Sequence, residues 1–387
     1  MQTMKRYKLS ELIEIKNGRD HKDLPNGDYP VFGSGGIMRY VNKYIYDKPS
    51  ILLPRKGTLN NIQYCDKPFW TVDTLYYTEV NEELACPYYL YRLLSLLDLS
   101  RLDSGTGVPS MTFDSYYNIK VWLPKIEEQR CIASVLQKLD AKIELNRQIN
   151  DNLEAMAKQL YDYWFVQFDF PNEDGKPYKS SGGAMVWNEK LKREIPEKWN
   201  VANVFDELSV QYGFPFSTEL FTEEPTNIPV VRIRDILENS VSAYSEEEVD
   251  EKYKLQKQDL VIGMDGNFHM NYWNDNVSYL NQRSVRLRTK SKSTVSIMQA
   301  KYDIAPYIKA KELRAKGSTV GHLSDKDLKE LFVLVSPNAD FRNKLDSILA
   351  EIIENRCEMI ELTKQRDELL PILMNGQATV NYHLSDD

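Results

Sequence analysis

The sequence predicts a mixed α/β (α+β) protein: two globular units separated by two long antiparallel helices that form a coiled coil, with a pseudo-twofold internal repeat. Three observations predict this fold. They are a repeat with a period of 213 residues, two helical segments with heptad spacing, and a Pro-, Gly- and Ser-rich segment between the halves. A length of 387 residues is enough for two or three domains that each bury a core.

The repeat is clearest where the two helical segments begin. The run PKIEEQRCIASVL starts at Pro124, and PNADFRNKLDSIL starts 213 residues later at Pro337. A weaker match at an offset of 209 aligns ILLPRKG, from Ile51, with LVIGMDG, from Leu260. The sequence therefore predicts that a globular unit followed by a helix occurs twice. The expected segments are a unit at 1–124, a helix at 125–168, a linker at 169–198, a unit at 199–337, a helix at 338–378 and a tail at 379–387.

Both helical segments place mostly apolar residues at alternating spacings of three and four. The first series is Ile132, Val135, Leu139, Lys142, Asn146, Ile149, Leu153, Met156, Leu160 and Tyr163. The second series is Phe341, Leu345, Ile348, Ile352, Asn355, Met359, Leu362, Arg366, Leu369 and Leu373. A helix of about 40 residues is about 60 Å long, which is more than one unit can cover, so we expect the helices to pair. The alternative is that each helix packs only on its own unit.

Within the globular units the pattern is one of short strands and turns. Apolar runs predict strands at 50–54 and 230–234, and an Asn-Gly pair and a Gly-Gly pair predict turns at 26–27 and 35–36. Short helices are expected at 87–98 and 303–315. The segment 169–198 has the composition of a linker.

Composition excludes several classes of protein. Hydrophobic residues make up 42% of the chain and charged residues 27%, which argues against wholesale disorder. We find no apolar run long enough for a membrane span, no signal-peptide core and no close pair among the four cysteines, so we expect a cytoplasmic protein without a membrane partner. The net charge of −8 by itself argues against nucleic acid, but residues 276–302 contain six basic residues and no acidic one.

The sequence contains none of the motifs that we associate with catalysis. A dinucleotide fingerprint, a phosphate-binding loop, zinc-ligand spacing and the S-adenosylmethionine motif of amino-methyltransferases are all missing. The run Gly33–Gly36 is expected to be a tight turn, and Asp325 to begin a helix. We therefore expect no catalytic residue, no metal site and no cofactor in this chain.

Two similar polar loops are the best candidates for a binding site. One covers 55–61 and the other 264–271, at matching places in the two halves. Arginine can read guanine and asparagine can read adenine, and glycine lets the backbone approach a phosphate. The alternative is that each loop is an ordinary surface hairpin. The residues expected to bind DNA are Ser34, Gly35, Arg55, Lys56, Thr58, Asn60, Asn61, Asp265, Asn267, His269, Arg283, Arg286, Arg288 and Lys290.

A run of alternating basic residues supports the same interpretation. Arg286, Arg288, Lys290 and Lys292 would all lie on one face of a strand. That face could contact DNA, and then Arg288→Ala should weaken binding to every sequence. A solvated edge strand is the alternative.

Three parts of the chain resemble type I restriction–modification specificity (S) subunits. PKIEEQRCIA, LDAKIELNRQ and YWFVQFD, all between residues 124 and 169, resemble the central conserved region of that family. SSGGAMVW and REIPEKW, which ends at Trp199, are similar to the stretch that follows it. RDELLPILMNG, which ends at Gly376, resembles the C-terminal conserved region. The resemblance covers essentially the whole chain.

The resemblance implies a subunit that recognises DNA and is not itself an enzyme. Two target-recognition domains each bind half of a split double-stranded target, and two antiparallel helices set the gap. The subunit docks two modification (methyltransferase) subunits, which hold S-adenosylmethionine, and through them the restriction/translocase subunits, which use ATP and Mg²⁺. The assembled complex is a DNA adenine methyltransferase and endonuclease.

One departure from the family pattern concerns docking. The second helix begins with NADFR where the first has KIEEQ, so the second copy lacks the Glu-Gln pair at this place. The equivalence of the two docking surfaces therefore does not follow from the resemblance.

Three other functions are alternatives to this interpretation. A self-contained restriction–methylation enzyme would need the missing motifs. A protein-only coiled-coil scaffold would explain the helices but not the twin loops. The specificity subunit of a related bipartite methyltransferase or restriction system remains an alternative. If the helices set the gap, four residues inserted in the first helix, about 6 Å, should lengthen it by one or two base pairs.

Overall fold

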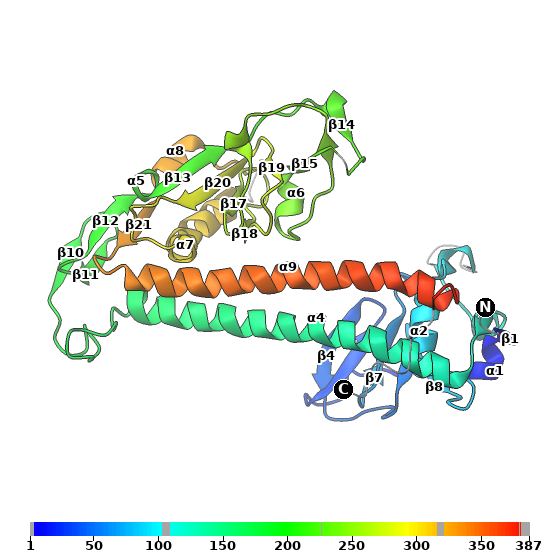
Figure 1. The fold of residues 1–387 in the computed structure, drawn as a ribbon. Helices are drawn as coiled ribbons and strands as arrows, with labels where there is room; N and C mark the ends of the chain where they lie inside the picture. Colours follow the sequence, from blue (N-terminus) through cyan, green and yellow to red (C-terminus); the bar gives the residue numbers. More distant parts are fainter. Residues whose placement is uncertain (1–3, 103–108, 226, 316–320, 379, 381–387) are drawn as a thin grey trace. The chain divides into compact units, whose positions relative to one another are not determined.

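The computed structural model describes residues 4–102, 109–225, 227–315, 321–378 and 380. Backbone contacts divide the chain into unit 1, residues 1–143 and 361–387, and unit 2, residues 144–360. Each unit contains one globular part and one half of each of two long helices (Figure 1). The expected α/β class is confirmed. Of the expected tail, 379–387, only Val380 is among the described residues.

Unit 1 contains three sheets and several short helices. Its elements are β1 (Lys5–Lys8), α1 (Leu9–Leu12), β2 (Ile13–Asn17), β3 (Tyr29–Gly33), β4 (Gly36–Val41), β5 (Ser50–Pro54), β6 (Gln63–Cys65), β7 (Trp70–Thr71), β8 (Leu75–Val80), α2 (Pro87–Ser95), the 3-10 helix η1 (Leu99–Leu102), α3 (Phe113–Tyr117) and β9 (Lys120–Leu123). The sheets have the orders β2-β8-β5-β6, β4-β3-β7 and β1-β9. The long helix α4 (Ile126–Tyr161) begins in this unit.

Unit 2 begins within α4 and ends within α9 (Asp340–Met374). Its elements are the π-helix η2 (Asp162–Val166), β10 (Met185–Asn188), β11 (Arg193–Pro196), β12 (Asn200–Asn203), α5 (Val204–Glu207), β13 (Leu208–Tyr212), η3 (Thr218–Leu220), β14 (Phe221–Thr222), β15 (Ile228–Val231), α6 (Ile233–Ile236), β16 (Tyr244–Ser245), η4 (Glu251–Tyr253), β17 (Leu260–Gly263), β18 (Met270–Tyr272), β19 (Tyr279–Leu280), β20 (Ser284–Thr289), α7 (Ile297–Ala315), α8 (Asp325–Lys329) and β21 (Phe332–Val335). The sheets are β13-β20-β17-β18, β14-β16-β15-β19, β12-β21 and β10-β11.

The two units share one topology. The four-stranded sheet β2-β8-β5-β6 of unit 1 corresponds strand by strand to β13-β20-β17-β18 of unit 2. In the second sheet, β3 pairs antiparallel with β4 and parallel with β7, as β15 does with β16 and β19. The capped helices α3 and α8 then precede β9 and β21, and a long helix follows each. The repeat predicted from the sequence is therefore a repeat of the fold.

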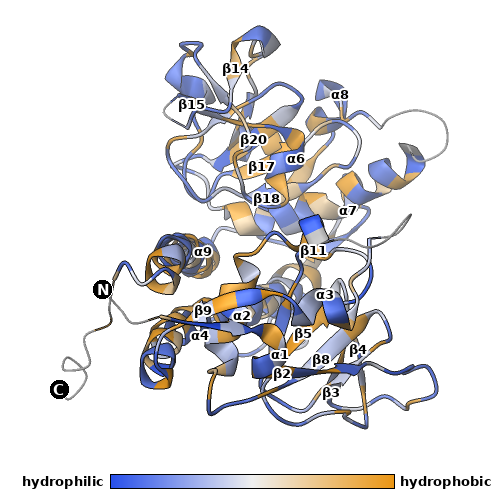
Figure 2. Ribbon diagram, turned by 90° about the vertical axis from the view of Figure 1, so that its right-hand side faces the viewer, coloured by the Kyte–Doolittle hydropathy of each residue, from blue (hydrophilic) through white to orange (hydrophobic). Residues whose placement is uncertain are grey.

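A fully buried strand lies inside the four-stranded sheet of each unit. Every residue of β5 (SILLP) and β17 (LVIG) is buried, and both strands are drawn in hydrophobic colours in Figure 2. The predicted strand at 50–54 is confirmed, whereas the one at 230–234 ends at Val231, because α6 begins at Ile233. The expected short helices are present as α2, which ends earlier, and α7, which begins earlier.

The segment 169–198 is not a free linker. It contains the β10–β11 hairpin, and Phe170 stacks on Tyr178 and on Trp199 with ring centroids 4.8 and 5.0 Å apart. Phe170 and Ile195 belong to the core of unit 2. The abundance of Pro, Gly and Ser masked these aromatic anchors, each of which buries a large apolar area.

The two long helices run antiparallel in each unit. In unit 2, Asn146 donates to Glu358 Oε2 at 2.7 Å and Asn150 donates to the carbonyl of Ile352 at 3.2 Å, so the chain number rises in α4 as it falls in α9. Asn355 donates to Asn150 Oδ1 at 2.9 Å. Asn146 and Asn150 are buried and Asn355 is partly buried. Asn146 and Asn355 belong to the predicted series, whereas Asn150 does not, and amides paired in this way favour one register.

The predicted seam of α4 is half wrong. Ile132 and Asn146 are buried as expected, but Met156 is 43% exposed and its neighbour Ala157 is buried. The observed series is Ile132, Leu136, Leu139, Ile143, Asn146, Asn150, Leu153, Ala157, Leu160 and Trp164, in which every second position is one residue later than predicted. The predicted series in α9 agrees better, except that Leu369 is exposed and Leu370 is buried. Neighbouring apolar residues allow either spacing, and only the partner surface selects one.

The first turn of each long helix is tied to its own unit by a different residue. The buried Gln129 donates to the carbonyls of Leu84 and Pro124, both at 3.0 Å, and accepts from the backbone N–H of Cys86. Arg342, 213 residues later, donates to the carbonyl of Ser293, just before α7. Gln129 therefore faces the interior of unit 1, and Arg342 replaces it in unit 2. The absence of the Glu-Gln pair at the start of α9 therefore goes with a different set of hydrogen bonds between the helix and its own unit.

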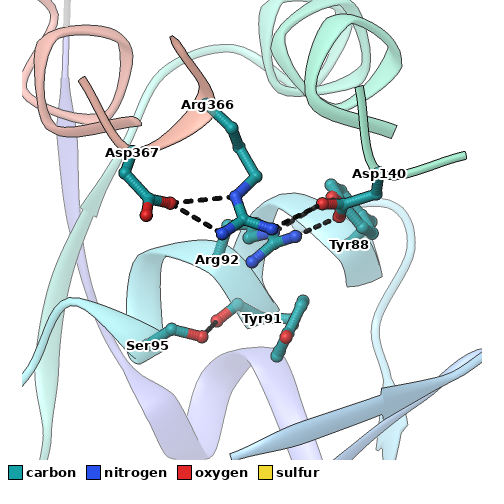
Figure 3. A network of polar contacts seen from close by, with 7 residues as sticks. All are labelled: Tyr88, Tyr91, Arg92, Ser95, Asp140, Arg366 and Asp367. Atoms are coloured by element: carbon teal, nitrogen blue, oxygen red, sulfur yellow. Dashed lines mark hydrogen bonds and ion pairs between the residues drawn. The ribbon is translucent and has the colours of Figure 1, made fainter. Parts of the chain in front are cut away.

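A polar network connects α2 to both long helices within unit 1 (Figure 3). Asp140 accepts hydrogen bonds from Tyr88 and Arg92 on one oxygen, and from Arg366 at 3.0 Å on the other. Asp367 also pairs with Arg366, but its side chain is 59% exposed. Burial alone would raise the pKa of Asp140. The hydrogen bond from Tyr88, the charge of Arg92 and the hydrogen bonds from both arginines outweigh it and lower that pKa.

We expect Asp140→Asn to lower the free energy of unfolding of the full chain by about 3 kcal/mol at pH 7, because two partly buried guanidinium groups lose their counter-charge. The contribution of Asp140 is present above its unfolded pKa of about 3.9 and is lost as the pH falls through the lower folded value. Urea unfolding between pH 7 and pH 3 measures it. The control Asp367→Asn should cost under about 1 kcal/mol, because that pair is exposed. Equal losses in the two variants would contradict this account.

Candidate nucleic-acid interface

The twin polar loops occupy the same place in the two units. In unit 1 the loop 55–62 connects β5 to β6, and in unit 2 the loop 264–269 connects β17 to β18. These strands correspond in the shared topology. Leu59 and Phe268 are buried and anchor the two loops. The loops therefore match in fold position as well as in sequence offset.

Backbone hydrogen bonds hold the unit 1 loop between two other segments. The N–H of Arg55 donates to the carbonyl of Thr74 at 2.9 Å, and the carbonyl of Arg55 accepts from Met111 at 3.0 Å. The N–H of Gly57 donates to the carbonyl of Pro109 at 3.0 Å. The loop is thus held by two stretches of the chain, one at Thr74 and one at 109–111.

The unit 2 loop is held by the same set of bonds. The N–H of Met264 donates to the carbonyl of Arg283 at 2.8 Å, and the carbonyl of Met264 accepts from Leu323 at 2.7 Å. The N–H of Gly266 donates to the carbonyl of Gly321 at 2.9 Å. Gly57 of unit 1 and Gly266 have φ values of 93° and 71°, a left-handed conformation that favours glycine at both places.

The turn Gly33–Gly36 lies against the unit 1 loop. Asn61 donates through Nδ2 to the carbonyl of Ser34 at 2.6 Å, and Gln63 donates to the carbonyl of Gly33 at 2.8 Å. Gly33 pairs with Gly36, which confirms the predicted tight turn. The structure therefore brings Ser34 and Gly35 next to the loop that the sequence grouped with them.

The loop side chains of unit 1 differ in how far they are engaged. Lys56 and Thr58 are exposed, and neither side chain has a partner among the described residues. Arg55 lies over the ring of Tyr76, 5.9 Å from its centroid. Asn60 accepts from the N–H of Leu99 at 2.8 Å, so it has a structural role in addition to any contact with DNA.

In unit 2 the loop presents a charged cluster. Arg283 donates to Asp265 Oδ2 at 2.9 Å, and His322 Nδ1 lies 2.5 Å from Asp265 Oδ1. The side chains of Asn267 and His269 have no partner among the residues that the structure describes. This loop is therefore polar like its counterpart but carries different groups.

The predicted face of alternating basic residues does not exist. The strand β20 ends at Thr289, and it lies in the interior of its sheet, so the edge-strand alternative is also wrong. Arg286 is 5% exposed, and burial lowers the pKa of its guanidinium. Arg288 pairs with the buried Asp259. A basic residue in a strand can be taken up by a buried carboxylate next to it, as Arg288 is by Asp259, which alternation alone does not reveal.

Lys290 lies beyond the strand and also has internal partners. Its ammonium group donates to the carbonyls of Phe205 and Asp206 at 2.7 and 2.9 Å. These carbonyls belong to the short helix α5, where a cation is favourable. Lys292 is exposed and follows the end of β20.

The sequence did not single out three residues that the structure places beside the loops. They are Thr74, Ser110 and His322. Ser110 forms a backbone bridge with Lys56, as His322 does with Asp265. A sequence match between Met111-Thr112 and Leu323-Ser324 could have indicated that the preceding residues, Ser110 and His322, correspond. Thr112 and Ser324 both cap the short helix that follows.

The part of the chain that the structure describes contains no group of three or more His, Cys, Asp or Glu residues arranged to hold a metal ion. Among the same residues, no helix has both the length and the apolar character needed to cross a bilayer.

The fold and the loops define a duplicated protein with one candidate binding surface in each unit. Residues 1–155 and 196–371 match the sequence profile of the family described as type I restriction modification DNA specificity domain. The chain belongs to this family, so the resemblance noted in the sequence is confirmed.

Known relatives carry the same description. The type I restriction enzyme MjaIX specificity subunit of Methanocaldococcus jannaschii is 25% identical over 93% of this chain and 86% of its own length. The EcoBI specificity subunit of Escherichia coli is 26% identical over 48% of this chain and 40% of its own length. A crystal structure of a type I restriction-modification system S subunit from M. genitalium has a TM-score of 0.65 at 17% identity, covering 96% of each chain, which shows a common fold.

Proposed function

We propose that this chain is the DNA sequence-specificity subunit of a type I restriction–modification complex, in which each unit binds one half of a bipartite double-stranded target. The observation that carries the proposal is the pair of loops with the same backbone hydrogen bonds and different side chains. A shared frame with unlike side chains suits independent recognition of two unlike half-sites, because base contacts specify sequence whereas the frame sets position.

The remaining parts of the proposal concern assembly. The paired helices α4 and α9 set the gap between the half-sites and dock two methyltransferase subunits, which bind S-adenosylmethionine. The restriction/translocase subunits, which use ATP and Mg²⁺, join through that methyltransferase core. The chain contributes recognition and no catalytic group, and the complex acts in the cytoplasm. Family membership and the paired helices support this assignment.

Loop substitutions in the complex with the methyltransferase subunits test the proposal. Lys56→Ala and Thr58→Ala should alter only the half-site bound by unit 1, and Asn267→Ala and His269→Ala only the other. Each base contact that is lost should cost about 1–3 kcal/mol at one position. Methylation profiling of host DNA reports both half-sites and the gap.

These four residues suit the test because their side chains have no partner among the described residues, so folding should be preserved. Asn60→Ala is the structural control, since it removes the bond to Leu99 and should lower stability as well. If no loop variant altered the motif, the loops would be surface hairpins. If the complex bound DNA no more tightly in a gel shift than the methyltransferase subunits alone, a protein-only scaffold would be favoured.

A further inference from the structure

Three positions share their backbone bonding in the two units but differ in every side chain. The first position is the second residue of each polar loop. The second is the residue whose carbonyl accepts a hydrogen bond from the backbone N–H of the first loop residue. The third lies just before α3 or α8 and forms a backbone bridge with the second loop residue. They are Lys56, Thr74 and Ser110 in unit 1, and Asp265, Arg283 and His322 in unit 2. Such positions can change recognition without changing the fold.

In unit 2 the three side chains form one cluster at the surface. Asp265 is 24% exposed and accepts from Arg283 on one oxygen and contacts His322 on the other, at 2.9 and 2.5 Å. The side chain of Arg283 is 62% exposed. Its other N–H groups have no partner among the described residues. The carboxylate therefore holds one edge of the guanidinium and leaves the remainder free to donate.

The backbone of Arg283 has a φ of 65°, a left-handed conformation that is uncommon for a residue other than glycine. Four other non-glycine residues among those described share it, Lys192 among them, so the conformation by itself assigns no role. The free donors of the exposed guanidinium carry the assignment.

Resting on the proposed function, we propose that Arg283 reads a guanine in the half-site bound by unit 2, with Asp265 as the residue that positions it. A guanidinium donates in a fixed fork to O6 and N7 of guanine, the most common specific contact to a base. Fixing the plane of the fork beforehand reduces the conformational freedom lost on binding. Unit 1 has threonine at this position, so it reads its half-site by a different contact.

Arg283→Gln and Arg283→Lys in the complex with methyltransferase subunits test the assignment. Both should lower discrimination at one G·C pair of the unit 2 half-site by about 5- to 100-fold, measured by binding to duplexes with that pair replaced. Because the proposed contact is to a base and not to a phosphate, both variants should leave the slope of binding against salt nearly unchanged. Asp265→Asn should relax the same pair to a smaller extent without changing the slope.

Lys192→Ala is the charge-matched control, because it removes a 72% exposed cation from the β10–β11 turn of the same unit. It should leave every base preference intact. The inference is wrong if both Arg283 variants keep full discrimination at every G·C pair, or if the relaxed pair is A·T. A wild-type complex that yields no bipartite motif would overturn the proposed function instead. Unchanged thermal melting of the Arg283 variants separates loss of recognition from loss of fold.

Discussion

Arg288→Ala is expected to lower the free energy of unfolding of unit 2 by about 3–5 kcal/mol. The guanidinium of Arg288 binds both oxygens of Asp259, each at 2.6 Å. Asp259 is 2% exposed, so the substitution leaves a buried carboxylate without its counter-charge. The sequence predicted that this residue would contact phosphate and that its loss would weaken binding to every DNA. The structure instead pairs it with a buried carboxylate, while its own side chain is 31% exposed.

Urea unfolding followed by hydrogen exchange in β17 and β20 measures the loss. Arg234→Ala is a matched control, since that arginine is 68% exposed and lies 3.9 Å from its nearest carboxylate. It should change stability by less than about 1 kcal/mol. Removing both charges, in Arg288→Gln with Asp259→Asn, should cost less than Arg288→Ala alone. Unchanged stability combined with a smaller salt slope would restore the phosphate-contact interpretation.

Insertion of one heptad into both long helices is expected to lengthen the gap between half-sites by about three base pairs. Seven residues add about 10 Å of helix, and a base pair rises about 3.4 Å. Insertions after Ile143 and after Ile360, where the chain passes from one unit to the other, leave the polar contacts within each unit in place. Methylation profiling of the complex reports the gap, and both half-sites should remain unchanged.

The observed register changes what we expect when four residues are inserted in the first helix alone. Asn146 contacts Glu358 and Asp140 contacts Arg366, so lengthening one helix moves these pairs out of phase. We expect that variant to lose stability instead of giving a clean longer gap. A change of half-sites with an unchanged gap in the double insertion would refute the role of the helices as a ruler.

The repeat and the fold class were predictable because they depend on patterns along the chain. Heptad spacing and the matching runs at Pro124 and Pro337 indicated two units and two helices, and the twin loops were found at corresponding strands. The seam of α4 was predictable only in part. Met156 and Ala157 both suit a helix, and only packing in the core of unit 2 selects Ala157.

The residues of the candidate site were likewise predictable only in part. The sequence by itself determined that two polar loops, each with a glycine, recur in the two halves, because residue type and offset are local properties. Only the tertiary structure decided that Arg286 is buried, that Arg288 neutralises Asp259 and that His322 lies beside Asp265. Burial and charge pairing depend on residues far apart in the chain, and the free energy of a charge is set by which of them surround it.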